Sequence, residues 1–299
     1  MDVDLFDYEL PPGFIAQTPI NPRDAARLLD LTNGGLKDRF IQELPFILEP
    51  GDLLVANNTR VIPTKLQGQC ASKRITVNLH KKVSPSIWFA FARPAKRVTQ
   101  GDLIMFHDSV VAKVLERNRG ELLLEFELSD KDLMGLLEQR GSMPLPPYIK
   151  RDDPSSNVAD LKDYQSIFAR HEGAVAAPTA SLHFTDRLVA SLKKNSIDIA
   201  YLTLHVGAGT FLPVKVKDTD NHDMHSEWAE LGSKAVEEIK NVKARGNKVI
   251  ALGNVASDSL RKVNVEHFKM PHPSPRNRQL NDKQFEKTMI RKCYNYLQG

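Results

Sequence analysis

The sequence predicts an α/β main domain that carries an inserted small all-β barrel. Between residues 63 and 149, short alternating segments separated by glycine and charged turns recur about every ten residues, which is typical of a small barrel. Outside this range, apolar strand-like segments alternate with helical patterns, and polar loops follow the strands. We therefore predict a discontinuous main domain of residues 1–62 plus 150–299 and a barrel domain of residues 63–149.

Composition excludes several classes of protein. The chain has 299 residues, of which 41% are hydrophobic and 26% charged, so a globular fold is expected rather than a disordered or fibrous one. Its only two cysteines are far apart in the sequence, which argues against a disulfide framework and favours the reducing cytoplasm. The acidic N-terminus lacks the apolar region of a signal peptide, and no apolar run reaches the ~18 residues of a membrane span.

The first part of the main domain combines short strands with one expected helix. An apolar run over 25–31 ends at a strong turn signal, Asn33-Gly34-Gly35. Residues 36–48 have helical spacing until Pro50-Gly51, and residues 52–58 form an apolar run that enters a polar turn. We expect a helix over 36–48 and a buried strand over 52–58.

The barrel segment holds the whole positive excess of the chain. Its strands are expected over 75–79, 87–92, 102–106, 110–115 and 121–128, and it closes near the proline stretch 144–147. It contains thirteen Lys/Arg and nine Asp/Glu, an excess that equals the net charge of +4 of the full sequence. This favours a surface that contacts a polyanion, although a chance distribution of solvated charges gives the same count.

The second part of the main domain continues in strand and helix order. Helices are expected over 184–193, 233–245 and 285–297, and strands over 197–205 and 248–252. Glycines at 207 and 209 follow the strand that ends at His205.

Polar residues concentrate at the ends of these strands. Asn57 and Asn58 offer amide donors and acceptors, and Arg60 offers a planar fork for a carboxylate or phosphate; an Asx turn is the structural alternative. His205 could act as a general acid or base, although a lone histidine is more often structural. Gly207 and Gly209 allow a ligand to approach the backbone closely.

A histidine pair invites a metal interpretation. His222 and His225 have the spacing of paired ligands, with Glu227 two residues further on. The surrounding residues predict a loop, so hydrogen bonding to a polar substrate is the favoured reading and a metal-dependent hydrolase the alternative. No Gly-x-Ser-x-Gly motif supports a serine hydrolase.

Ten stretches in this order resemble one family, the S-adenosylmethionine:tRNA ribosyltransferase-isomerases of queuosine biosynthesis. They occupy residues 6–11, 15–19, 23–24, 51–55, 57–63, 145–149, 164–165 with 175–180, 182–185, 204–214 and 225–227. Among the most characteristic are Asn57-Asn58-Thr59-Arg60, Val175-Ala176-Ala177-Pro178-Thr179-Ala180 and His205-Val206-Gly207-Ala208-Gly209-Thr210.

The resemblance implies a fold, a reaction and partners. The fold is an α/β domain with an inserted β-barrel. The reaction moves the ribosyl part of S-adenosylmethionine to the 7-aminomethyl-7-deazaguanine of tRNA, giving epoxyqueuosine-tRNA, adenine and methionine. S-adenosylmethionine is a substrate, no metal or other cofactor is implied, and the expected partner is tRNA. We expect a cytoplasmic protein with no membrane contact, and nothing in the sequence requires more than a monomer.

The matched positions suggest site residues for this chemistry. We expect His205 and His183 to act as an acid/base pair, and His225 with Glu227 to form a second relay or hold the ribose hydroxyls. Substrate-binding residues are expected to be Asn57, Asn58, Arg60, Thr179, Gly207, Gly209 and Thr210.

The C-terminal part departs from the family pattern and is shortened. After the strand at 248–252, Asn254-Val255 stands where the family has a Thr-Thr pair, and later family stretches are absent. Ala174 and Ser181 stand where serine and glycine are usual. These departures leave open a degenerate relative that binds tRNA or S-adenosylmethionine without turnover.

Overall fold

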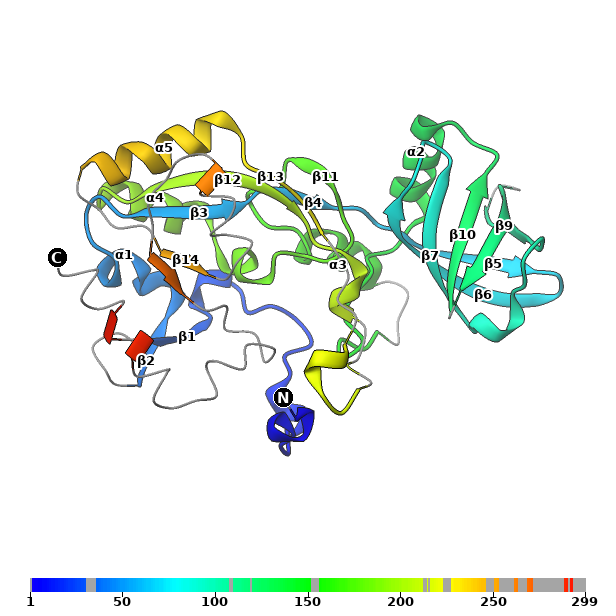
Figure 1. The fold of residues 1–299 in the computed structure, drawn as a ribbon, viewed down its shortest axis with the longest axis horizontal. Coiled ribbons are helices and arrows are strands. Elements are labelled where there is room, and N and C mark those ends of the chain that lie inside the picture. Colours follow the sequence, from blue (N-terminus) through cyan, green and yellow to red (C-terminus); the bar gives the residue numbers. More distant parts are fainter. Residues whose placement is uncertain are drawn as a thin grey trace.

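Six antiparallel strands close into a barrel in the computed structural model of the chain (Figure 1). The structure describes residues 2–30, 36–107, 110–118, 120–151, 156–211, 214, 216–222, 227–245, 250–252, 261–262, 268–270, 288–289 and 291–292. The barrel strands run in the order β10-β7-β6-β5-β8-β9, with β10 pairing β9 to close the ring. Their bounds are β5 Lys65–Cys70, β6 Lys73–Lys82, β7 Ile87–Arg93, β8 Leu103–Met105, β9 Val111–Asn118 and β10 Glu121–Phe126. The predicted barrel is confirmed.

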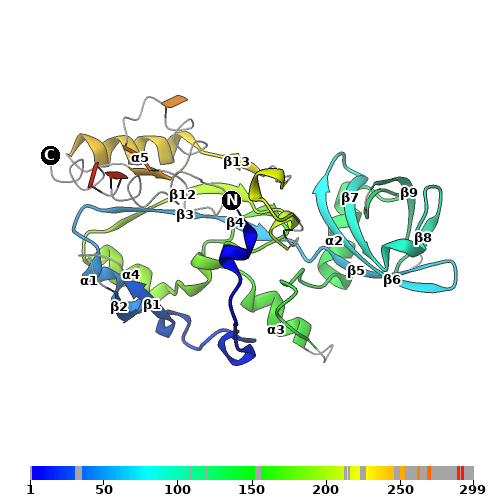
Figure 2. The ribbon, with the colours of Figure 1, turned by 60° about the horizontal axis from the view of Figure 1, so that its bottom comes forward.

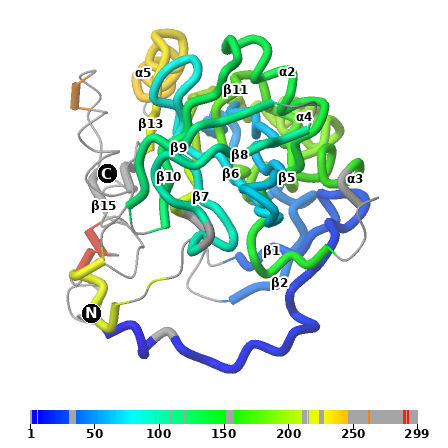
Figure 3. The backbone as a smooth tube through the Cα atoms, turned by 90° about the vertical axis from the view of Figure 1, so that its right-hand side faces the viewer, coloured from blue at the N-terminus to red at the C-terminus, as the bar shows by residue number. Residues whose placement is uncertain are grey.

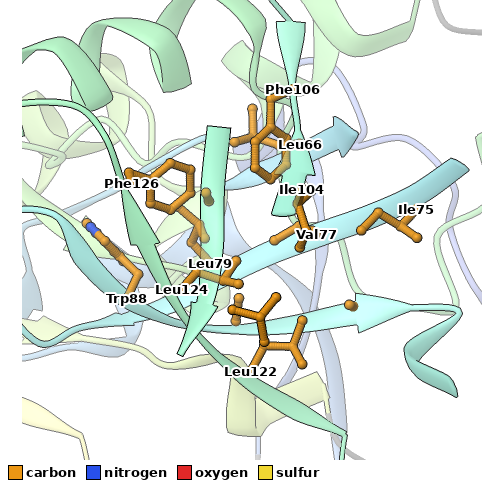
Figure 4. Packing of buried hydrophobic residues seen from close by; sticks show 14 of the residues in the cluster. Leu66, Ile75, Val77, Leu79, Trp88, Ile104, Phe106, Leu122, Leu124 and Phe126 are labelled. Carbon is orange, nitrogen blue, oxygen red and sulfur yellow. The ribbon is translucent and has the colours of Figure 1, made fainter. Parts of the chain in front are cut away.

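Alternation of apolar and polar residues places one side of each strand inside the barrel. Along β10, Leu122, Leu124 and Phe126 are buried, whereas the residues between them are only half-buried. Figure 4 shows these side chains in one cluster with Trp88 of the neighbouring strand β7 and Leu79 of β6. The alternation of apolar residues at every second position therefore predicted the barrel strands, and it also places their apolar side chains in this core.

A helix that the sequence analysis did not anticipate covers one end of the barrel. Helix α2 spans Asp130–Arg140, and the Ser129 hydroxyl caps it by accepting from the Asp132 backbone N–H at 3.2 Å. Its residues Leu133, Leu136 and Leu137 join the barrel core. At the helix end the chain passes so close to Pro63 that a Cβ on Gly141 would lie 1.9 Å from the Pro63 carbonyl oxygen. The two ends of the barrel segment therefore meet here.

A mixed three-stranded sheet with helices beside it lies at the other end of the molecule (Figures 1 and 2). Strand β12 (Asp198–His205) is central, parallel to β3 (Leu53–Asn57) and antiparallel to β13 (Trp228–Glu230). Helix α5 (Ser233–Ala244) lies on one side of β12, and helix α4 (Asp186–Lys194) lies on the other.

The core on the α4 side is small and apolar. Leu188 and Leu192 of α4 pack with Ile41 and Ile197, and the half-buried Ile199 of β12 packs against this cluster. The amphipathic pattern of the helix is what directs these leucines toward the strands. The strands and helices predicted here over 52–58, 197–205, 184–193 and 233–245 are confirmed to within a few residues.

A second, parallel pair links this region to the barrel. Strand β4 (Thr59–Val61) pairs with β11 (His171–Ala174), and β4 continues directly toward β5. The Gln165 side chain behaves as an additional partner of β4: it accepts from the Val61 N–H at 3.1 Å and donates to the Val61 carbonyl at 2.6 Å.

The expected helix over 36–48 is wrong in its first part. Residues Lys37–Phe40 form β2, which pairs with β1 (Arg27–Asp30); the helical part is the 3-10 helix Ile41–Glu43 followed by α1 (Leu44–Ile47). Cross-strand ion pairs favour the hairpin: Arg39 contacts Asp30 at 2.8 Å and Arg27 contacts Asp38 at 2.7 Å.

The remaining described elements are short. Helix α3 spans Ser156–Asp163, and strands β14 (Ile250–Leu252) and β15 (Phe268–Met270) pair in parallel. Only residues 288, 289, 291 and 292 of the helix predicted over 285–297 lie among the described residues. None of the described helices is both long and apolar enough to cross a membrane.

Polar contacts attach the N-terminal segment, among them a hydrogen bond from the Val3 N–H to the Lys217 carbonyl at 2.8 Å. It runs along one edge of the molecule (Figure 3), with Leu5 and Phe14 more than 70% exposed. The Gln17 side chain joins it to the residues that follow the proline stretch, by donating to the Tyr148 carbonyl at 3.1 Å and accepting from the Lys150 N–H at 2.8 Å.

Candidate functional site

A polar cavity of about 630 Å³ lies where strands β3 and β12 end. Because these strands are parallel, their carboxyl ends meet at one edge, the usual place for ligands in α/β sheets. The cavity combines imidazoles, guanidinium groups, carboxylates and aromatic rings. Its lining residues are Asn58, Arg60, Arg170, His171, Glu172, Tyr201, Leu202, Thr203, His205, Trp228, Glu230 and Gly232.

His205, the last residue of β12, is held by three neighbours. The indole of Trp228 stacks on its ring with centroids 4.9 Å apart, and the Thr59 hydroxyl lies 2.7 Å from its Nδ1. Gly173 lies against the ring, because a Cβ there would be 2.5 Å from Nε2. Burial, assisted by the charge of the nearby His171, lowers the pKa of His205, so the imidazole is neutral at physiological pH.

The two predicted asparagines differ in what they contact. The Asn58 side chain lines the cavity and accepts from the Thr203 hydroxyl at 2.8 Å. The Asn57 side chain instead joins two strands: it donates to the Leu204 carbonyl at 2.8 Å and accepts from the N–H groups of Leu204 and Thr59 at 3.1 and 3.0 Å. Its amide is committed to the backbone, and Asn57 is not among the residues that line the cavity.

Arg60 reaches the cavity together with residues that the sequence analysis missed. Its Nε lies 3.7 Å from Oε1 of Glu172, and both side chains are about half exposed. Arg170 lies over the Tyr201 ring, 5.2 Å from its centroid. A signal for these residues existed in the sequence, because Arg170-His171-Glu172-Gly173 directly precedes the characteristic stretch at 175–180.

The loop after His205 lies against the segment that leads into β13. The Gly207 N–H donates to Oε1 of Glu227 at 3.0 Å, and no atom lies within 4 Å of the position a Cβ on Gly207 would take. Gly209 and Thr210 lie in the short 3-10 helix Ala208–Phe211 that follows. Glu227 therefore orders this loop next to Trp228, the stacking partner of His205.

His183 and Thr179 lie on a different element. Both belong to the 3-10 helix Thr179–His183; both are exposed, and neither is among the residues that line the cavity. Desolvation and the charge of Arg23 lower the pKa of His183. Arg23 itself is bound to backbone carbonyls, at 2.8 Å from Gln165 and 3.0 Å from Lys162.

The predicted metal alternative receives no support from the residues that can be judged. His225 lies outside the described residues, so the predicted pairing of His222 with His225 lies outside them too. Among the described residues, no group of three or more His, Cys, Asp or Glu side chains could hold a metal ion.

The chain thus combines a closed six-stranded barrel with a polar cavity that offers charged and aromatic side chains at the ends of parallel strands. The family described as queuosine biosynthesis protein matches residues 3–284. The match continues beyond residue 252, where the C-terminal departures from the family pattern begin. The chain belongs to this family.

Two sequence relatives agree with this assignment. The chain is 49% identical to the S-adenosylmethionine:tRNA ribosyltransferase-isomerases of Rhodospirillum rubrum, over 86% of this chain and 74% of the relative, and of Rhizorhabdus wittichii, over 86% and 75%. A solved S-adenosylmethionine tRNA ribosyltransferase from Thermotoga maritima is 28% identical over 86% of this chain and 72% of that chain, with a TM-score of 0.35.

Proposed function

We propose that this chain transfers and isomerises the ribosyl group of S-adenosylmethionine onto the 7-aminomethyl-7-deazaguanine of tRNA. The products are epoxyqueuosine-tRNA, adenine and methionine. The observation that carries the proposal is the neutral His205 in a polar, aromatic-lined cavity of a chain that is 49% identical to enzymes named for this activity.

The chemistry requires several proton transfers. The sulfonium acidifies the adjacent C5′–H, so a base must remove that proton; adenine leaves more readily with a proton donor; and the attacking amine must be neutral. A neutral imidazole suits the first of these steps, and His205 is our candidate. His183, and His225 with Glu227, remain candidates for the other transfers.

Binding roles follow from the side chains that face the cavity. Trp228 is 54% exposed although one face stacks on His205, so its indole offers a surface on which a nucleobase could stack. Arg60 and Arg170 offer guanidinium groups for the methionine carboxylate, and Asn58 offers an amide. Thr179, Gly207, Gly209 and Thr210 stay as proposed substrate contacts.

The proposal also includes an organisation of the molecule. Residues 1–62 and 150–299 form one α/β domain, and residues 63–149 form the inserted barrel domain. The protein acts as a monomer on tRNA in the cytoplasm and uses no cofactor besides its substrate S-adenosylmethionine.

The direct test is to incubate the protein with S-adenosylmethionine and tRNA that carries the aminomethyl-deazaguanine, and to measure adenine and the modified nucleoside by mass spectrometry. Matched tRNA with unmodified guanine at the same position is the control. The proposal predicts equal amounts of adenine and epoxyqueuosine, both absent from the control. If the tRNA binds but neither product forms, the chain is a relative that binds without turnover.

A further inference from the structure

Thr59 connects His205 to the backbone of a neighbouring strand. Its hydroxyl oxygen lies 2.7 Å from Nδ1 of His205 and 3.4 Å from the carbonyl oxygen of His171. Thr59 is 1% exposed, and its position is fixed because β4 pairs with β11 on one side and its N–H donates to the Asn57 side chain. Water therefore does not compete for this hydroxyl.

Only one arrangement of hydrogens satisfies both contacts. The threonine hydroxyl has a single proton, and the carbonyl of His171 can only accept. If the hydroxyl donates to His171, it must accept from an N–H at Nδ1 of His205. In the opposite arrangement the hydroxyl donates its proton to Nδ1, and no proton is left to form a hydrogen bond with the His171 carbonyl.

We propose that Thr59 is a positioning residue that holds neutral His205 with its proton on Nδ1 and thereby leaves Nε2 as the proton acceptor. The inference rests on the proposed function. In that reaction the C5′–H proton of S-adenosylmethionine passes to the lone pair of Nε2, and the electron pair of the broken bond stays on the carbon beside the sulfonium. The imidazolium formed in this way keeps its Nδ1–H bond to Thr59.

The packing around His205 supports a single ring orientation. Stacking on Trp228 and the close approach of Gly173 confine the ring plane. A half-turn of the ring within that plane would put a carbon in place of Nδ1 and break the 2.7 Å bond to Thr59. Thr59 therefore fixes both the tautomer and the direction of Nε2.

The tautomer can be measured without any turnover. The protein is labelled with ¹⁵N-histidine, and the His205 signals are identified by their loss in His205→Asn. The proposal predicts a protonated-type shift for Nδ1 and an unprotonated-type shift for Nε2 at a pH where the ring is neutral. The reverse pattern in the unmodified protein overturns the proposal, whether or not the protein is active.

Three substitutions test the role of the hydroxyl. Thr59→Val removes it at nearly constant shape, Thr59→Ser keeps it, and Thr76→Val removes a hydroxyl that bonds Gln67 on the barrel. Thr59→Val is expected to give a mixture of tautomers and a kcat at least about tenfold lower with little change in KM, because the base loses its orientation. Thr59→Ser should keep the Nδ1–H tautomer and a kcat near that of the parent. Thr76→Val should change neither the tautomer nor kcat.

The two proposals fail in different ways. An unmodified protein with the predicted tautomer but no product contradicts the proposed function and leaves the Thr59 assignment standing. An active protein in which Thr59→Val keeps the Nδ1–H tautomer and full kcat contradicts the Thr59 assignment alone.

Discussion

At the scale of single residues, the site depends on small groups that leave room for His205. Gly173 has φ +149°, a conformation that favours glycine, and it lies directly against the imidazole. The ring can stack on Trp228 only because no side chain occupies this position. Gly173 thus contributes to the site by leaving room for the imidazole.

Gly173→Ala should displace the imidazole. The added Cβ would lie 2.5 Å from Nε2 of His205, and alanine would be strained at the φ of this position. We therefore expect kcat to fall on the order of tenfold or more and the melting temperature to decrease. The measurement is steady-state kinetics with thermal unfolding.

Gly135→Ala is the matched control, because Gly135 lies in α2 with no atom within 4 Å of an added Cβ. It should keep activity and raise stability by up to about 1 kcal/mol, as expected for glycine to alanine in a helix. Equal behaviour of the two variants would contradict the packing argument for Gly173.

Asp24 forms an ion pair with Arg187, whose side chain is 58% exposed. Its carboxylate is fully buried and accepts from Nε of Arg187 and from the Thr185 hydroxyl, each at 2.6 Å. The hydrogen bond from Arg187 holds the pKa of Asp24 below its ordinary value, against the opposing effect of burial. The pair joins the N-terminal segment to the start of α4.

Arg187→Met should therefore destabilise the fold in a pH-dependent way. A carboxyl whose pKa is lowered by folding stabilises the protein above its unfolded pKa of about 4, and this stabilisation is lost as the pH falls through the folded pKa. We expect the variant to melt a few degrees below the parent at pH 7, with the difference shrinking below about pH 4.

The control for this prediction is Arg27→Met. Its ion pair with Asp38 is about three-quarters exposed on both sides, so no measurable change is expected at either pH. A pH-independent difference for Arg187→Met would show that lost packing, and not the Asp24 pair, explains the effect.

At the scale of elements, Asn57 replaces a stretch of strand pairing between β3 and β12. Its two hydrogen bonds to Leu204 continue the pairing with β12, and a third, local bond accepts from the Thr59 N–H. These bonds commit the amide of Asn57, a predicted substrate-binding residue, to backbone groups.

Asn57→Ala should lower the free energy of unfolding by about 2–3 kcal/mol, because backbone groups of Leu204 and Thr59 lose their partners. Asn195→Ala, which removes one side-chain bond to the Ser191 carbonyl, should cost only about 1 kcal/mol. Chemical denaturation measures both. Equal losses would contradict the idea that Asn57 connects the strands.

Local patterns predicted most of the elements, and long-range pairing explains the misses. Alternation predicted the barrel strands because one face of each strand is buried. The β1–β2 hairpin was missed because its ion pairs join residues nine and eleven positions apart, which helical spacing does not register. Thr59 and Gly173 were not selected as site residues because their importance arises only when β4, β11 and β12 come together.

At the scale of the whole molecule, the barrel has its own core. Its buried cluster runs from Ile62 to Leu137 and includes α2, and the ends of the segment meet where Gly141 touches Pro63. A segment whose ends are adjacent can be separated from its host with little rearrangement.

The proposed domain boundaries predict that residues 63–149 fold alone. The isolated segment should show a cooperative thermal transition and strand-type circular dichroism. A matched segment that ends at residue 129 lacks α2 and should lose that transition, because Leu133 and Leu137 are fully buried in the barrel core. An isolated segment 63–149 without cooperative unfolding would contradict the boundaries.

We place the proposed ribosyl transfer in the cavity around His205. S-adenosylmethionine labelled with ¹³C throughout the ribose tests this placement when the label is followed into the tRNA nucleoside. We expect labelled epoxyqueuosine from the parent protein and at least about a hundredfold slower labelling by a folded His205→Asn variant. Labelling at the parent rate by that variant would show that ribosyl transfer does not depend on His205.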